Sequence, residues 1–159
     1  MRRWLLFAGR LAIAVLFLYA GYEKVRQPWI QFAISVDSFK VVPDTWEKPI
    51  AEILPWFEIC LGLWLLLPSV VSRWATLVAT GLLMFFLSIG IRASVLGLNV
   101  DCGCFGAGHS GAIDKTWFLE HVAMVVGAVV VTVFEFLPAR KPYRPTYSSQ
   151  AFSSADSAD

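Results

Sequence analysis

The chain has 159 residues and a formal net charge of +1, with 57% hydrophobic and 16% charged residues and a mean hydropathy of +0.64. Soluble domains contain roughly 45–50% apolar and about 25% charged residues, so this composition excludes an ordinary soluble protein and indicates an integral membrane protein. The near-neutral charge and the absence of a basic stripe in the sequence predict membrane lipid as a partner and no nucleic acid.

Four apolar segments follow one another along the chain. They run over residues Trp4–Tyr22, Ile50–Leu67, Trp74–Leu96 and Trp117–Leu137. Each is close to the ~20 residues that a helix needs to cross a ~30 Å hydrocarbon core. Arg2 and Arg3 give the first segment some likeness to a signal peptide, but Arg10 interrupts its apolar run, so we predict a retained helix. The sequence thus predicts an all-α fold, a four-helix transmembrane bundle over residues 4–137.

The loop after the first segment carries a further helical pattern. Its apolar residues recur at i, i+3, i+4 and i+7, namely Trp29, Phe32, Ala33, Val36 and Phe39. This spacing predicts a short interfacial helix between the first and second transmembrane helices. Residues 146–159 are rich in Ser, Ala and Asp without periodicity, and we predict that residues 138–159 form a cytoplasmic, disordered tail.

The cations favour one orientation in the membrane. With the N-terminus in the cytoplasm, the inner residues would be Arg2, Arg3, Arg73, Arg140, Lys141 and Arg144, and the outer ones Lys24, Arg26, Lys40, Lys48 and Lys115, with Arg92 near that end. We therefore predict a multi-pass protein of the inner (plasma) membrane with both termini cytoplasmic. The loop containing Cys102 and Cys104 would then face an oxidising extracytoplasmic compartment.

Charged residues inside apolar segments are candidates for function, because each costs roughly 2.5–3.5 kcal/mol on insertion unless it is paired or hydrated. Arg10 and Glu58 lie at depths that a long Arg side chain could largely span, so we predict that they form a pair. Either the pair is a structural clamp, or it belongs to a polar route or a site for a headgroup or quinone. Pro55, three residues before Glu58, can kink its helix and leave a carbonyl without a backbone donor.

The cysteines divide into a pair and a single thiol. Cys60 falls in the second apolar segment and is predicted to be inert packing. Cys102 and Cys104 are separated only by Gly103, and a disulfide between them would close a small, strained ring. Closing so short a loop would stabilise the fold little, so redox exchange is favoured over a structural disulfide or two idle thiols.

The histidines suggest no catalytic or metal centre. Cys102, Cys104 and His109 offer three ligands for a soft metal, but no fourth ligand is evident, so we predict no metal site. His121, beside Glu120, is expected to be hydrated or paired with that neighbour.

Three motifs in order resemble a known family. The motifs are "GYEKVRQP" (Gly21–Pro28), "LPWFEICLGLWLLL" (Leu54–Leu67) and "DCGCFG" (Asp101–Gly106). Together they are similar to the MauE (methylamine utilisation) group of the DoxX-like membrane proteins. The resemblance implies a four-helix membrane bundle with signature positions at Gly21, Lys24, Pro28, Pro55, Glu58 and Gly62. It also implies a thioredoxin-like partner and a link to the maturation of methylamine dehydrogenase, whose small subunit carries many disulfides.

The sequence and the resemblance together favour a redox-associated membrane protein, a possible thiol-disulfide oxidoreductase. Cys102 and Cys104 would cycle between dithiol and disulfide with an extracytoplasmic thioredoxin-like protein. A quinone is a possible electron acceptor, near Arg10, Glu58 or Arg92. Two alternatives stay open: a non-enzymatic scaffold subunit of a larger membrane complex, and a small transporter.

Overall fold

The computed structural model describes residues 2–98 and 115–137, which form five α-helices and, within those ranges, no strand. The helices are α1 (Arg2–Arg26), α2 (Trp29–Ser38), α3 (Asp44–Leu65), α4 (Ser69–Val95) and α5 (Lys115–Phe136). The predicted all-α class is therefore confirmed. The predicted short helix after the first segment is also present, as α2.

Prolines mark where three of these helices begin. Pro28, Pro43 and Pro68 each stand immediately before a helix, with ψ between 130° and 149°. The proline ring fixes φ near the helical value and disfavours a helical conformation in the residue before it, so one helix ends and the next begins there. At the end of α4, Gly97 adopts φ +66°, and its N–H donates to the Ser94 carbonyl oxygen at 3.1 Å. A left-handed glycine of this kind terminates a helix at low steric cost.

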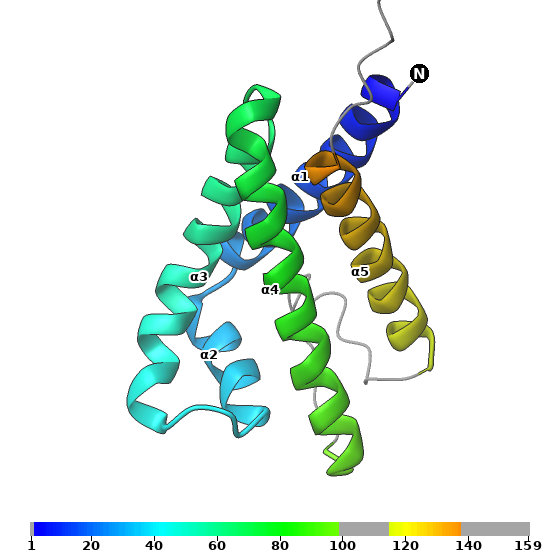
Figure 1. Ribbon diagram of the computed structural model, residues 1–159. Coiled ribbons are helices and arrows are strands. Elements are labelled where there is room, and N and C mark those ends of the chain that lie inside the picture. The colour runs from blue at the N-terminus through cyan, green and yellow to red at the C-terminus, as the bar shows by residue number, and fades with distance from the viewer. Residues whose placement is uncertain (1, 99–114, 138–159) are drawn as a thin grey trace, which may run out of the picture.

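The four long helices alternate in direction, as Figure 1 shows: α1 and α4 run one way, α3 and α5 the other. The end of α1, the start of α3, the end of α4 and the start of α5 all lie toward α2; we call this the α2 end. The closest packing joins α1 to α3 and α4 to α5. Between α4 and α5 the hydroxyl groups of Thr80 and Thr132 share a buried hydrogen bond of 2.8 Å.

The core of the helix assembly combines large apolar side chains with alanines. Its buried members include Phe17, Leu61, Leu65, Leu83, Ala14, Ala75, Ala79 and Ala128. Small residues let helices approach closely. In a bilayer the hydrophobic effect does not drive helices together, so close packing of this kind contributes much of their association.

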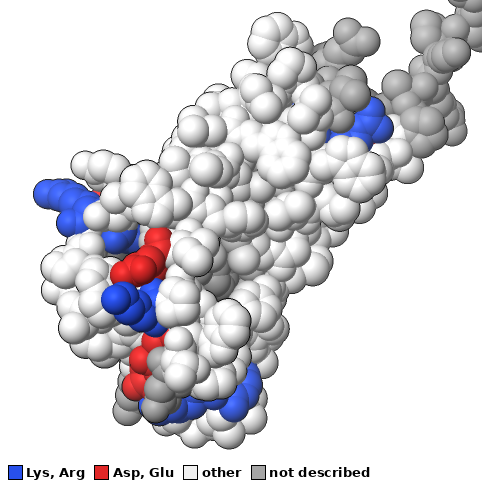
Figure 2. Space-filling view, turned by 90° about the vertical axis from the view of Figure 1, so that its left-hand side faces the viewer, with Lys and Arg blue, Asp and Glu red and all other residues white. Residues whose placement is uncertain are grey.

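Three helices are long and apolar enough to cross a membrane: α1 over Trp4–Arg26, α4 over Val71–Val95, and α5. Their outward side chains are apolar, and Figure 2 shows a wide surface without charge between the charged residues of its two ends. The predicted span at Ile50–Leu67 does not meet the same standard in α3. The reason is that α3 ends at Leu65, so every stretch of it long enough to span a membrane contains Lys48, Glu52 and Glu58. The described residues thus contain three helices that could span a membrane, and the four-helix transmembrane bundle stays a prediction.

Two predictions lie outside the described residues. These are the loop with Cys102 and Cys104, and the disordered tail at 138–159. The domain assignment of residues 4–137 also stays a prediction.

Candidate functional site

A buried ion pair joins α1 to α3 near the α2 end. Lys24 Nζ lies 2.8 Å from Glu58 Oε2 and 2.9 Å from Glu58 Oε1, so the ammonium donates to both carboxylate oxygens. The side chains are only 2% and 1% exposed. Because each charge neutralises the other, two ionised groups can remain inside an apolar helix assembly. The sequence analysis did not predict a pair between Lys24 and Glu58.

Close approach of the two helices makes this pair possible. At Gly21, one turn before Lys24, a Cβ atom would lie 2.8 Å from the Pro55 carbonyl oxygen and 2.7 Å from Ile59 Cγ1. The missing side chain lets α1 rest directly on the backbone of α3. Glu58 follows Pro55 by about one turn, and its carboxylate therefore meets the end of the Lys24 side chain. The residues of two family motifs thus form one contact.

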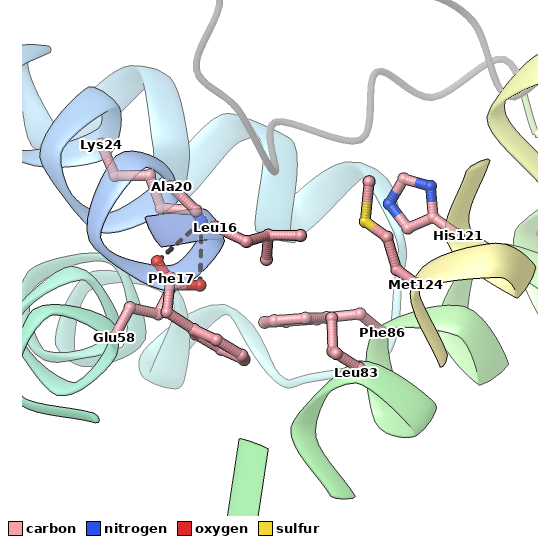
Figure 3. Close-up of a pocket in the computed structure, with 9 residues that line it drawn as sticks. All are labelled: Leu16, Phe17, Ala20, Lys24, Glu58, Leu83, Phe86, His121 and Met124. Atoms are coloured by element: carbon pink, nitrogen blue, oxygen red, sulfur yellow. Dashed lines mark hydrogen bonds and ion pairs between the residues drawn. The ribbon is translucent and has the colours of Figure 1, made fainter. Parts of the chain in front are cut away.

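Two cavities meet at Lys24. The smaller one, of about 20 Å³, lies between the ion pair and the pair His121 and Met124 of α5, with Leu16 and Phe86 also in its wall (Figure 3). The larger one, of about 120 Å³, lies beneath α2 and is lined by apolar residues of α2, α3 and α4. Glu58 lines only the smaller cavity, whereas Lys24 lines both. Lys24 is therefore the polar residue that these two cavities share.

The predicted pair between Arg10 and Glu58 is wrong. Arg10 instead donates to the Ser72 hydroxyl and lies 3.6 Å from Glu135 Oε1, near the opposite end of the helix assembly. Arg10 Nε and Glu135 Oε2 are buried and have no hydrogen-bond partner among the described residues. The prediction failed because α1 continues to Arg26, which places Lys24 inside the helix assembly and nearer to Glu58 than Arg10 is.

Arg92, the other predicted polar residue, ties α4 to the turn after α2. Its Nη1 donates to the carbonyl oxygens of Phe39 and Lys40 at 3.0 and 3.4 Å. Lys40 has φ +49°, a left-handed conformation that is unusual for a residue with a side chain. Arg92 thus stabilises the turn that leads from α2 into α3. Neither Arg92 nor Arg10 lines the larger cavity, although both were candidates for the quinone site.

His121 is buried, so the expected hydration is wrong, whereas the alternative pairing with Glu120 stays a prediction. Its Nδ1 lies 2.9 Å from the carbonyl oxygen of Trp117, and its ring stacks on the Trp117 indole with centroids 3.9 Å apart. The reason is that this position of α5 faces α1 and α4, where His121 lines the smaller cavity.

The cysteine pair lies beyond the described ranges, so its predicted exchange stays a prediction. Cys60 is described, and it is a free thiol on the exposed surface of α3. Within residues 2–98 and 115–137 no three His, Cys, Asp or Glu side chains come together as a metal site.

Sequence reasoning missed Glu135 and the partnership of Lys24. Both have a sequence signal: Glu135 interrupts the fourth apolar segment, and Lys24 follows Gly21 by one helical turn within the first motif. Treating the first helix as ending at Tyr22 hid the second signal.

Helices that could cross a membrane, with buried ion pairs between them, define a small polytopic membrane protein. The sequence model of the family described as "Methylamine utilisation protein MauE" matches residues 2–134. The chain belongs to the MauE family. Membership of the wider DoxX-like group stays a prediction.

Individual relatives agree with this assignment. The methylamine utilization protein MauE of Paracoccus denitrificans is 28% identical over 137 residues, which cover 86% of this chain and 72% of the relative. MauE of Methylorubrum extorquens is 29% identical over 110 residues, which cover 69% of this chain and 58% of that protein. No solved structure matches the chain.

Proposed function

We propose that the protein exchanges thiol and disulfide equivalents through Cys102 and Cys104 with a thioredoxin-like partner outside the cytoplasm. This activity would support the maturation of exported proteins, of the methylamine dehydrogenase type in this family. The observation that carries the proposal is the Cys-Gly-Cys pair in a chain of the MauE family. Two thiols one residue apart gain little as a structural disulfide but are well suited to exchange.

The proposed step balances as a two-electron exchange. In one direction, a thiolate of the pair attacks the partner's disulfide, an S–S bond forms between the two proteins, and a partner thiolate leaves. The second thiolate of the pair then attacks the mixed disulfide. The chain ends with a Cys102–Cys104 disulfide and the partner with two thiols, so two electrons pass to the partner. The reverse sequence uses the same steps.

The arrangement of the helices supports a loop at one membrane face. The end of α4 and the start of α5, which flank the pair in the sequence, both lie toward the α2 end (Figure 1). Exchange requires that this face be extracytoplasmic. The proposed location is therefore the inner (plasma) membrane, with both termini in the cytoplasm and the Cys-Gly-Cys loop outside.

The rival function is a scaffold subunit of a larger membrane complex, in which the Cys-Gly-Cys stretch is only a tight turn. A small transporter is the third possibility. Against it, the interior charges of this chain pair with each other, Lys24 with Glu58 and Arg10 with Glu135.

Alkylation of the thiols in intact cells distinguishes exchange from a scaffold role. On a Cys60→Ser background only Cys102 and Cys104 can react, because the chain has three cysteines. We expect part of the population to take up maleimide only after reduction, and this oxidised fraction to change when the thioredoxin-like partner is deleted. A pair that is fully alkylated without reductant in both strains contradicts the proposal and supports the scaffold.

A further inference from the structure

The cavity of about 120 Å³ beneath α2 is not explained by thiol exchange. Protein interiors are close-packed, and voids of this size are few. For comparison, an engineered apolar cavity of about 150 Å³ binds benzene and stays free of water. The cavity beneath α2 therefore has the size of a single six-membered ring.

The wall of the cavity is suited to a flat ring. Four phenylalanines contribute to it, two from the α2 region and two from α4: Phe32, Phe39, Phe85 and Phe86. Aromatic faces and edges favour stacked or edge-on contact with another ring. Aliphatic side chains, among them Leu54 of α3 and Ile89 of α4, complete the wall. An occupant would thus meet aromatic and aliphatic surface on most sides.

One end of the cavity carries a charge. Among the described residues that line it, Lys24 alone is ionisable, and its Nζ lies 5.4 Å from the centroid of the Phe32 ring. Glu58 holds this ammonium in place from the far side. The other polar group, the Ser35 hydroxyl, donates to the Gln31 carbonyl oxygen within α2. Lys24 is therefore the donor that an oxygen atom of an occupant would meet.

Part of the cavity wall is exposed on the outer surface of the protein. Two of its lining residues are exposed on the apolar surface, Phe85 by 54% and Val41 by 41%. Beside Val41, Arg92 holds the turn after α2 to α4 through the Phe39 and Lys40 carbonyl groups. A molecule dissolved in the bilayer could enter between α2 and α4 without crossing the aqueous face.

We propose that this cavity binds the ring of a benzoquinone-class molecule from the membrane, with Lys24 donating a hydrogen bond to a ring carbonyl oxygen. The ring fills the aromatic part of the cavity, the carbonyl accepts from the ammonium, and the hydrocarbon tail leaves between α2 and α4 into lipid. The site does not require the cysteine pair, so it stands independently of thiol exchange.

The test is a titration of the full-length chain in nanodiscs of phosphatidylcholine that contain no quinone. The cysteine-free variant Cys60→Ser/Cys102→Ser/Cys104→Ser is used, because thiols add covalently to quinones. The probe is para-benzoquinone with a decyl tail, compared with decylbenzene and decane by calorimetry. We expect the quinone to bind saturably and decane not to bind. Decylbenzene should bind at least about tenfold more weakly than the quinone, because it cannot accept a hydrogen bond from the charged donor.

Cavity-filling variants locate the binding. Ile89→Phe adds volume inside the cavity, whereas Ile91→Phe makes the same change two residues away on the exposed side of α4. We expect Ile89→Phe to weaken quinone binding at least tenfold and Ile91→Phe to leave it unchanged; Leu54→Phe on α3 provides a second filling variant if Ile89→Phe does not fold.

Three results would overturn the proposal: no saturable quinone binding, equal binding of decylbenzene, or filling variants that bind like Ile91→Phe. All three concern a protein without thiols, so they leave the proposed exchange at Cys102 and Cys104 unaffected.

Discussion

At the scale of single residues, the Lys24–Glu58 pair is a buried contact between α1 and α3 whose loss should cost stability. Replacing Glu58 by Gln leaves the buried ammonium without its counter-ion, and the loss of one member of a buried pair costs about 3–5 kcal/mol. We expect Glu58→Gln to lower the free energy of unfolding by this amount, measured by titration with sodium dodecyl sulfate from mild detergent. A loss of stability of this size is what we expect if the pair acts as a structural clamp between α1 and α3.

A matched control lies on the same helix. Glu52 faces Lys48 at 3.9 Å on the surface of α3, with side chains 49% and 64% exposed. Exposed pairs contribute about 0–1 kcal/mol, so Glu52→Gln should change stability little. A Glu58→Gln protein as stable as Glu52→Gln but inactive would reject the clamp and favour a polar route.

The same residues show what sequence reasoning can and cannot reach. Arg10 and Glu58 stood out because charge is rare in apolar segments, and both are indeed buried. Their partners did not follow, because pairing depends on helix ends and on relative depth. Extending α1 by one turn, from Tyr22 to Arg26, changed the partner of Glu58 from Arg10 to Lys24.

At the scale of helices, the contact of α1 with α3 rests on glycine. Gly21→Ala would place its Cβ 2.8 Å from the Pro55 carbonyl oxygen, a backbone atom that cannot rotate away. Overpacking of this kind costs about 1–3 kcal/mol, which should appear as reduced stability in the same detergent titration.

The comparison variant is Gly81→Ala in α4, where an added Cβ meets nothing within 4 Å. Alanine is the better helix former by about 1 kcal/mol, so this change should be neutral or stabilising. If both glycine variants behave alike, the α1–α3 approach seen here is not what holds Lys24 against Glu58.

Helix positions were more predictable than helix limits. The apolar periodicity predicted α2 from Trp29 to Phe39, and the helix ends one residue earlier, at Ser38. The agreement is close because the apolar residues that define the pattern extend over the whole of this short helix. The second long helix was predicted to begin at Ile50 but begins at Asp44, since its first turns are polar and carry no hydrophobic signal. Lys48 in these turns, together with Glu52 and Glu58 further along the helix, explains why α3 is not apolar enough to count as a membrane span.

At the scale of the whole molecule, the features that the two proposals use lie toward the α2 end, whereas the Arg10–Glu135 pair lies near the other end. The Lys24–Glu58 pair, the two cavities that Lys24 lines, the end of α4 and the start of α5 all lie in that half. Composition was sufficient to predict a membrane protein, and three motifs in order predicted the MauE family. The interior cavities were not predictable, because they arise from how helices distant in sequence fail to fill a common space.

The most direct test of thiol exchange is to trap its covalent intermediate. Cys102→Ser and Cys104→Ser are each expressed on the Cys60→Ser background, so that one thiol remains to form a mixed disulfide that cannot be resolved. We predict that at least one of these variants accumulates a reductant-sensitive adduct with a thioredoxin-like protein, identified by mass spectrometry, and that the cysteine-free chain forms none. The account is contradicted if neither single variant captures a partner while the cysteine-free chain still supports normal maturation of exported disulfide proteins.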